Sequence, residues 1–250
     1  MYREWAPDPA LAHRLACVWT RVTTSAGTGL VVPDGCVDLV WGPRGPHVAG
    51  PDTGPMPVAM SPGDRYTGIR FRPGAVGEAL GVPVEALRDQ RVPLADLGGL
   101  PELDAEAVAA AITAAGTAGG GDGGSGSGGV RKVLGTVQEA LAVRLRATPG
   151  PDPAVPVVAA ALRTARSVGE VARDLGMSER QLHRRCVRAF GYGPKTLQRV
   201  VRFQRAIRLA GRGTALAEVA LASGYADQSH LSNEVRRLAG VSLRQLVSRP

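Results

Sequence analysis

The strongest constraint on the fold is a pattern of two short helices joined by a glycine turn, which occurs twice in the chain. In the first copy, Val171, Ala172 and Leu175 are the inward positions of a short helix. Gly176 can adopt the positive φ of a tight turn. Residues 178–181 read Ser-Glu-Arg-Gln, a capping box that opens a second helix. The pattern predicts a helix-turn-helix unit.

The pattern returns 49 residues later, measured from Leu182 to Leu231, with Gly224 as the turn and Asp227 as the cap. A longer helix over residues 196–210 separates the copies and can hold them at a fixed distance. Two recognition helices one turn of DNA apart, roughly 34 Å, would enter successive major grooves on one face of a duplex. The inward positions of the second copy are Leu216, Val219, Ala220, Ala222, Leu231, Val235 and Leu238.

The second helix of the first unit has one apolar face and one basic face. Leu182, Cys186 and Phe190 recur every four residues and therefore face the core. The opposite face is the one that a major groove can receive. We expect DNA contacts from its outward side chains, which are Arg180, His183, Arg184 and Arg188.

The charge of the chain is divided unequally between its two halves. Residues 1–129 hold nine Lys+Arg against 14 Asp+Glu, a net charge of −5. Residues 130–250 hold 21 Lys+Arg against eight Asp+Glu, a net charge of +13. Cations placed near phosphates release condensed counterions, so the asymmetry favours a nucleic-acid partner for the second half. A G+C-rich coding sequence explains the preference for arginine over lysine equally well.

Residues 198–209, 217–220 and 224–232 and the turn at 240–242 resemble the DNA-binding domain of the AraC/XylS transcription regulators. The resemblance implies a bipartite domain of seven helices with base contacts from both recognition helices. By position it implies readers at Arg180, His183 and Arg184 in the first unit and at Gln228, Ser229 and Asn233 in the second, and Arg236 is expected on phosphate. Family members commonly carry Arg where this chain has Asn233, and Asn pairs with adenine whereas Arg pairs with guanine.

The first half has the short strand-like runs of a small β structure. They span residues 15–24, 29–32, 36–41 and 66–71, and frequent prolines limit their length. Short helical pieces are expected over residues 75–80 and 85–87, and a longer helix over residues 103–115. The predicted fold class is α+β, a mainly β barrel-like domain followed by an all-α double helix-turn-helix domain.

Residues 33–41 and 68–74 resemble the uncharacterised sensor-type domain attached to a subgroup of these regulators. The resemblance implies a small cupin-related barrel and names no ligand. The aromatic side chains of this half could line a small-molecule cavity, although core packing explains them equally well. They are Trp5, Trp19, Trp41, Tyr66 and Phe71.

A run of glycine and serine over residues 119–129 predicts a flexible linker. The domains expected from it are a sensor domain over 1–118, the linker, a connecting helix over 130–150 and the DNA-binding domain over 151–250. The connecting helix has an apolar stripe that must be buried against a neighbour. We expect residues 130–250 to fold and to bind DNA without the first half.

Catalysis is the alternative function. A nucleophilic Cys36 beside Asp34 or Asp38 would make the chain a cysteine-dependent enzyme, or a repair or stress-sensing protein targeted to DNA. A buried, unreactive Cys36 in a turn is the simpler reading. None of Cys17, Cys36 and Cys186 forms a pair with metal-ligand spacing, so we expect no metal. We also expect no cofactor and no enzyme activity.

Double-stranded DNA is the expected partner, with a small-molecule effector of unknown identity, RNA polymerase and a second copy of the chain as further expected partners.

The first ten residues contain Arg3, Glu4 and Asp8 in place of the apolar stretch of a signal peptide. We therefore expect a cytoplasmic location.

Overall fold

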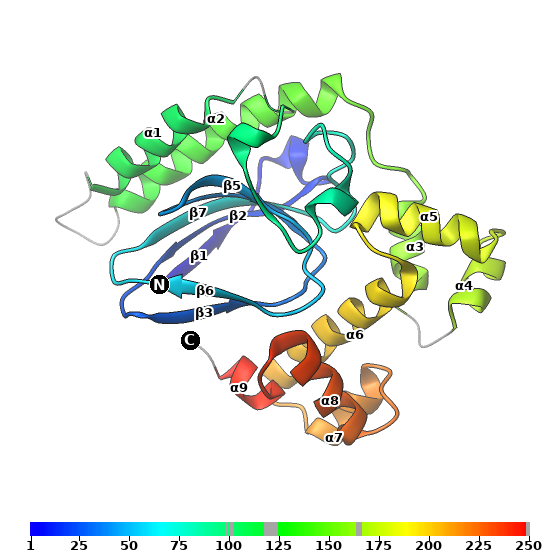
Figure 1. The fold of residues 1–250 in the computed structure, drawn as a ribbon. Coiled ribbons are helices and arrows are strands. Elements are labelled where there is room, and N and C mark those ends of the chain that lie inside the picture. Colours follow the sequence, from blue (N-terminus) through cyan, green and yellow to red (C-terminus); the bar gives the residue numbers. More distant parts are fainter. Residues whose placement is uncertain (99, 101–102, 118–124, 164–166, 249–250) are drawn as a thin grey trace.

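The computed structural model describes residues 1–98, 100, 103–117, 125–163 and 167–248. The chain begins with an antiparallel six-stranded sheet in the order β1-β2-β7-β4-β5-β8, and strands β3 and β6 form a second, two-stranded sheet opposite it (Figure 1). The strands are β1 (Tyr2–Trp5), β2 (Leu15–Val22), β3 (Gly27–Val31), β4 (Val37–Gly42), β5 (Gly45–Ala49), β6 (Met56–Met60), β7 (Arg65–Phe71) and β8 (Arg91–Pro93).

The register of the large sheet separates an apolar face from a mixed one. Val18 pairs with Ile69, which pairs with Leu39, and all three are buried in the main core. Helices α1 (Ala105–Thr117) and α2 (Ser125–Ala147) cover this face (Figure 1). Side chains alternate across a strand, so the neighbouring positions point toward the two-stranded sheet. They include Cys17, Trp19, Asp38, Val40 and Arg70.

The predicted linker is shorter than expected, and the predicted connecting helix belongs to the amino-terminal core. Helix α2 begins at Ser125, so residues 125–129 are helical, while residues 119–124 lie outside the described residues. The apolar stripe of α2 packs into the same core as the sheet. The backbone amide of Asp8 donates to Gln138 Oε1 at 2.7 Å, and Arg144 Nε donates to the Ala79 carbonyl at 3.0 Å. The glycine tract was expected to separate two domains, but the residues before it and helix α2 after it belong to one apolar core.

This packing changes the expectation for fragments. A fragment of residues 130–250 would expose the stripe formed by Leu134, Val137 and Leu141, each at most 1% exposed in the whole chain. We expect that fragment to self-associate, because the stripe has no partner surface there. A fragment of residues 152–250 lacks the stripe and is expected to stay monomeric. Size-exclusion chromatography of both at equal concentration compares them, and a monomeric 130–250 fragment would contradict the assignment of α2.

Several predictions for the first half were incomplete or wrong. Residues 75–80 form no helix: residues 77–80 are a turn, and Gly74 and Gly77 have φ of 74° and 61°, which a right-handed helix does not accept. Residues 85–87 belong to a 3-10 turn, Val84–Leu87, and the helix expected over 103–115 is α1. Strands β1, β5, β6 and β8 were missed. Proline lies in β6 of the small sheet, in the edge strand β8 and in β5, which lies between β4 and β8.

The second half is helical, as predicted, and has two separate apolar cores. The first core is formed by α3, α4, α5 and the start of α6. The second core is formed by the end of α6 together with α7, α8 and α9. Among the described residues, none of the helices combines the length and apolar character that crossing a membrane requires. The helices are α3 (Val155–Ala161), α4 (Val168–Asp174), α5 (Glu179–Phe190), α6 (Pro194–Gly211), α7 (Leu216–Ala222), α8 (Gln228–Ala239) and α9 (Leu243–Val247).

Candidate nucleic-acid interface

Helices α4 and α5 form the first helix-turn-helix unit with the local structure that the sequence predicts. Gly176 between them has φ of 65°. Ser178 caps α5: its Oγ accepts from the Gln181 amide at 3.2 Å, and Gln181 Oε1 accepts from the Ser178 amide at 2.8 Å. The capping box thereby satisfies two of the amides that have no partner within the helix at the start of α5. The start of this recognition helix is therefore fixed.

Helices α7 and α8 repeat the arrangement with a different cap. Gly224 has φ of 82°, and Asp227 Oδ1 accepts from the His230 amide at 2.7 Å. The His230 ring meets Tyr225 edge-on, with 5.3 Å between ring centroids, and its Nδ1 accepts from the Ala226 amide at 3.4 Å. His230 thus supports the turn, and Tyr225 packs in the second core.

The predicted DNA-contact residues lie on two separate helices with their side chains exposed. Leu182, Cys186 and Phe190 are at most 1% exposed, which fixes the orientation of α5. Leu231 and Val235 do the same for α8. All eight predicted residues are exposed: Arg180, His183, Arg184 and Arg188 on α5, and Gln228, Ser229, Asn233 and Arg236 on α8.

Arg188 differs from the other predicted contacts because it faces the amino-terminal domain. Its Nη2 lies 2.7 Å from Glu78 Oε1, and both side chains are largely exposed. An exposed pair of this kind contributes little to stability. Glu78 therefore competes only weakly with a phosphate for this arginine.

The sequence-based predictions above do not include a group of arginines on and beside α6. Arg202 and Arg205 line a hollow of about 300 Å³ together with Arg163, Arg208 and Arg212. Within the described part of the chain, no ion pair is found for any of the five. The Nε of Arg202 is buried and has no acceptor. The spacing of 202, 205, 208 and 212 on one long helix is the signal that would have revealed the group.

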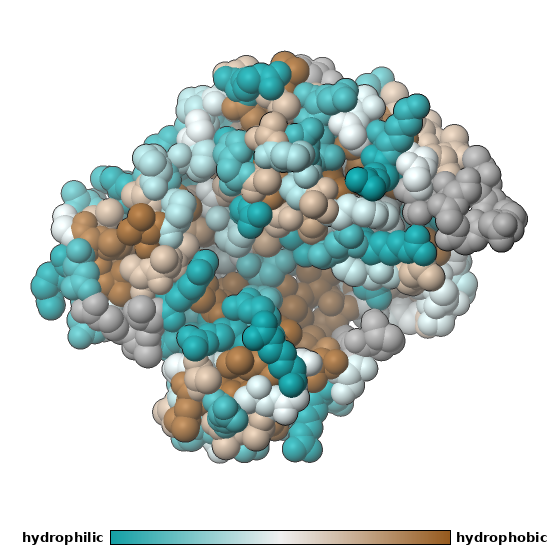
Figure 2. Space-filling view, turned by 180° about the vertical axis from the view of Figure 1, so that it is seen from behind, coloured by the Kyte–Doolittle hydropathy of each residue, from teal (hydrophilic) through white to brown (hydrophobic). Residues whose placement is uncertain are grey.

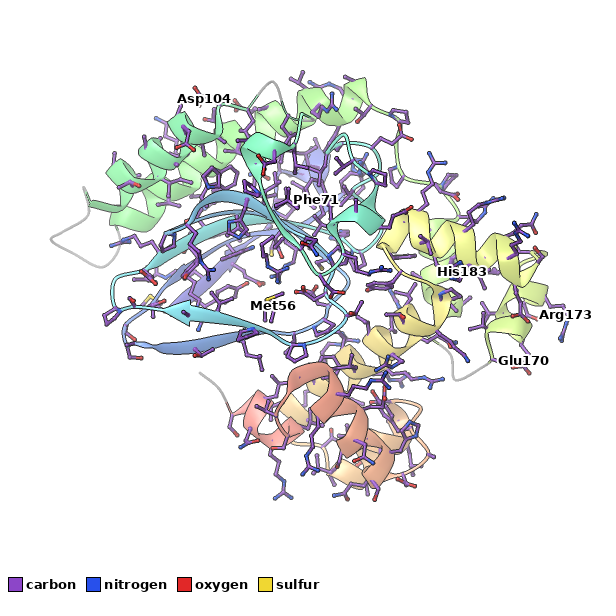
Figure 3. All side chains as sticks on the ribbon, viewed as in Figure 1. Met56, Phe71, Asp104, Glu170, Arg173 and His183 are labelled. Atoms are coloured by element: carbon purple, nitrogen blue, oxygen red, sulfur yellow. The ribbon has the colours of Figure 1, made fainter. Side chains whose placement is uncertain are left out.

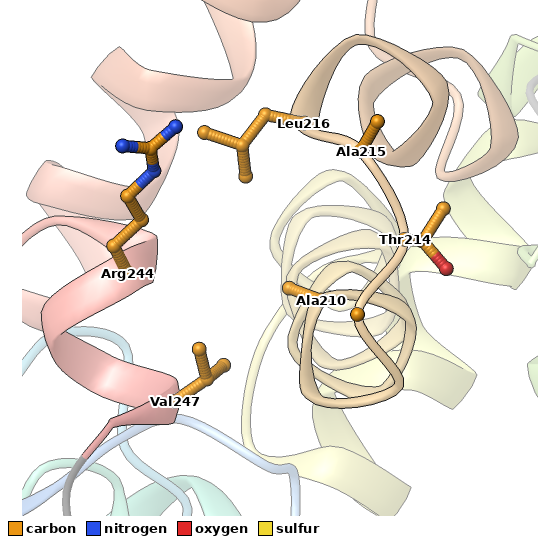
Figure 4. Close-up of a pocket in the computed structure, with 7 residues that line it drawn as sticks. Ala210, Thr214, Ala215, Leu216, Arg244 and Val247 are labelled. Atoms are coloured by element: carbon orange, nitrogen blue, oxygen red, sulfur yellow. The ribbon is translucent and has the colours of Figure 1, made fainter.

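A second hollow, of about 270 Å³, lies between the end of α6, the start of α7 and α9 (Figure 4). Its lining is mostly small or apolar, including Ala210, Leu216 and Val247, and Arg244 is its only charged side chain. This hollow contains none of the predicted DNA contacts.

The cysteines are held in their unreactive thiol form. Burial, followed by the nearby charge of Asp34, raises the pKa of Cys36 far above its ordinary value. Burial raises the pKa of Cys17 and of Cys186 to about 12. Because the thiolate is the nucleophile, these surroundings disfavour cysteine catalysis. Among the described residues, no three His, Cys, Asp or Glu side chains cluster in a way that could hold a metal ion.

Two family models match the chain. One, described as a helix-turn-helix domain, matches residues 171–249, and the other, described as a domain of unknown function (DUF6597), matches residues 3–93. Among curated proteins, none matches this sequence.

Several solved structures are similar to this chain. An AraC-type DNA-binding domain regulator from Chromobacterium violaceum is 25% identical over 39% of this chain and 90% of its own, with a TM-score of 0.35. ToxT from Vibrio cholerae is 8% identical over 92% of this chain and 97% of its own, with a TM-score of 0.49. ToxT from Vibrio cholerae bound to an unsaturated fatty acid is 11% identical over 94% of this chain and 95% of its own, with a TM-score of 0.45.

The DUF6597 match covers the strands of the amino-terminal half, and the helix-turn-helix match covers helices of the carboxy-terminal half. The helix-turn-helix match starts in α4 and ends just after α9, so it includes both recognition helices. The chain thus has a helix-turn-helix domain of the AraC type at its carboxy-terminal end and a domain of the DUF6597 family at its amino-terminal end, and it is a DNA-binding transcription regulator.

Proposed function

We propose that α5 and α8 read two neighbouring half-sites in successive major grooves. The observation that supports this proposal best is the exposure of the predicted contact residues on two capped helices whose opposite faces are buried in separate cores. Arg180, His183 and Arg184 would contact the first half-site, and Gln228, Ser229 and Asn233 the second. Sequencing of DNA selected by the purified chain tests this: a two-part logo is expected, and a logo with one half-site would contradict it.

The arginines of α6 are proposed to contact DNA phosphates between the half-sites. Substitution of both Arg202 and Arg205 by alanine is expected to weaken binding to cognate and random DNA by similar factors, because phosphate contacts carry no base information. The slope of log affinity against log salt should fall by about 1 for each phosphate that the variant no longer neutralises. Titrations at several salt concentrations measure both effects.

The matched control for this test is Arg65→Ala, which removes an exposed arginine from β7 in the other domain. It should leave affinity and salt slope unchanged. A cognate-specific loss in the Arg202 and Arg205 variant would assign these side chains to base contacts and contradict the phosphate proposal.

We propose that a small-molecule effector binds between the two sheets of the amino-terminal domain. Met56, Val58 and Met60 of β6 alternate with exposed residues and are only half-buried. Figure 3 shows Met56 between the sheets, whereas Phe71 lies in the main core on the other side. Figure 2 shows apolar residues at the floor of a hollow on the reverse face of the molecule. Flexible methionine side chains adapt to apolar ligands, so the effector is expected to have an apolar body.

Three other statements about this regulator stay predictions: contact with RNA polymerase, a homodimer and a cytoplasmic location. The apolar stripe of α2 offers no dimer surface, because it is buried within its own chain. A homodimer would therefore use another face of the amino-terminal domain.

A further inference from the structure

The two recognition helices end against the same loop of the amino-terminal domain. Each helix has a left-handed glycine as its C-cap, Gly191 after α5 and Gly240 after α8. A Cβ atom on Gly191 would lie 3.0 Å from Pro51 Cγ, and one on Gly240 would lie 3.6 Å from Pro55 Cγ. Pro51 and Pro55 both belong to the loop between β5 and β6. Equivalent points of the two units therefore touch one short segment.

A second loop, between β3 and β4, also touches both units. Val32 in this loop packs against the core of the second unit. Gln204 Nε2 on α6 donates to the Pro33 carbonyl at 2.7 Å. A Cβ on Gly35 would lie 3.1 Å from the hydroxyl of Tyr192, which follows α5 and is 2% exposed. Three adjoining parts of one loop thus contact the second unit, α6 and the first unit.

Both loops are tied to the sheet domain by buried or half-buried polar contacts. Asp52, in the loop between β5 and β6, accepts two hydrogen bonds from Arg91 of β8, at 2.9 and 2.7 Å. Asp34, in the loop between β3 and β4, lies 3.8 Å from Arg70 of β7. Because the loops are anchored at both ends and in between, they offer fixed points to the helices that rest on them.

Apart from these loops, α6 is the main connection between the two units, and it can hold them at a fixed distance. Their cores are separate and share only α6. One ion pair, Arg199 Nε to Glu234 Oε2 at 2.8 Å, links α6 to α8. A base pair added between two half-sites displaces one groove by about 3.4 Å and rotates it by roughly 35° about the DNA axis, so small changes in the angle between the units alter which spacing fits.

We propose that the two loops, residues 32–36 and 50–55, position α5 relative to α8 and thereby determine the spacing between half-sites that this regulator accepts. The inference rests on the proposed function, since it presupposes that both helices bind the same DNA. It assigns to the amino-terminal domain a share in operator specificity although none of its residues is proposed to contact a base.

The test uses the full chain and the half-sites found by selection, joined by spacers from two base pairs shorter to two base pairs longer than the selected one. Wild type is expected to lose at least about tenfold in affinity for one base pair of change, a loss of about 1.4 kcal/mol. Gln204→Ala removes the hydrogen bond to Pro33, and Val32→Asp places a charge against the second core. Both variants are expected to bind the best spacing within about threefold of wild type and to lose less than about threefold when one base pair is added or removed.

Val31→Asp is the matched control, because Val31 is 41% exposed and precedes Val32 directly. It should keep the wild-type spacing profile. Gln204→Ala keeps the proposal testable if Val32→Asp does not fold. If Gln204→Ala and every folded sample of Val32→Asp show the wild-type dependence of affinity on spacer length, the spacing proposal is overturned. The proposed function would not be affected by that result. If the wild-type chain binds no pair of half-sites more tightly than a single half-site, the proposed function itself is overturned.

Discussion

Arg184→Ala is expected to weaken binding to the cognate site by about 1–3 kcal/mol and to relax base preference at one position. The arginine is exposed on α5, one helical turn beyond Arg180 and on the face opposite the buried Cys186. Its guanidinium can donate two parallel hydrogen bonds to guanine O6 and N7, and alanine supplies neither. Titration with cognate and random DNA should show the loss mainly with cognate DNA.

Selected-site logos distinguish a base contact from a general loss of affinity. Asn233→Arg is the complementary variant on α8, where it should shift one position of the second half-site toward guanine. Arg65→Ala, on an exposed arginine of the other domain, should change neither logo nor affinity. Logos that are unchanged in both recognition-helix variants would show that the outward faces have been misassigned.

Arg70→Leu is expected to destabilise the amino-terminal domain by about 3 kcal/mol, because it leaves a largely buried carboxylate without its cation. Arg70 Nε donates to Asp38 Oδ1 at 3.0 Å, with side-chain exposures of 27% and 14%. Trp19 Nε1 also donates to this carboxylate at 3.0 Å and would be its remaining partner. Urea unfolding measures the loss, and Arg65→Leu on the same strand is the exposed control.

The loss of unfolding free energy that Arg70→Leu causes, relative to wild type, should become smaller as the pH falls. Burial raises the pKa of Asp38 above its ordinary value of 3.8, and Arg70 opposes that rise. Removal of Arg70 therefore raises the pKa of Asp38 further in the folded state. A folded state that holds the proton more tightly than the unfolded chain loses stability as the pH rises from near 3.8 through the folded pKa. Equal deficits at pH 5 and pH 7 would contradict the buried ion pair.

Local sequence signals predicted the carboxy-terminal half closely, because each of its elements has its own start and stop. Ser178 and Asp227 cap recognition helices where predicted, and Gly176 and Gly224 make the turns. Residue spacing alone also distinguished the buried from the exposed face of α5.

The amino-terminal half was predicted less well because its elements depend on distant partners. The strand Gly45–Ala49 contains glycine and proline and is held by pairing with β4 and β8. The glycine tract was interpreted by composition alone, which has no information about the sheet that α2 covers. The contacts of Pro51, Pro55 and Tyr192 between the domains have no signal in a single sequence, because they arise from how two separately built surfaces meet.

The place of α2 in the core has a consequence for the order in which the nascent chain acquires its structure. The last strand of the sheet ends at Pro93, whereas the helix that completes its cover ends at Ala147. During translation the apolar face of the sheet must therefore wait for residues that are added later, at about 5–20 residues per second. Only a short segment then precedes α3, so the amino-terminal domain closes just before the helices of the carboxy-terminal domain leave the ribosome.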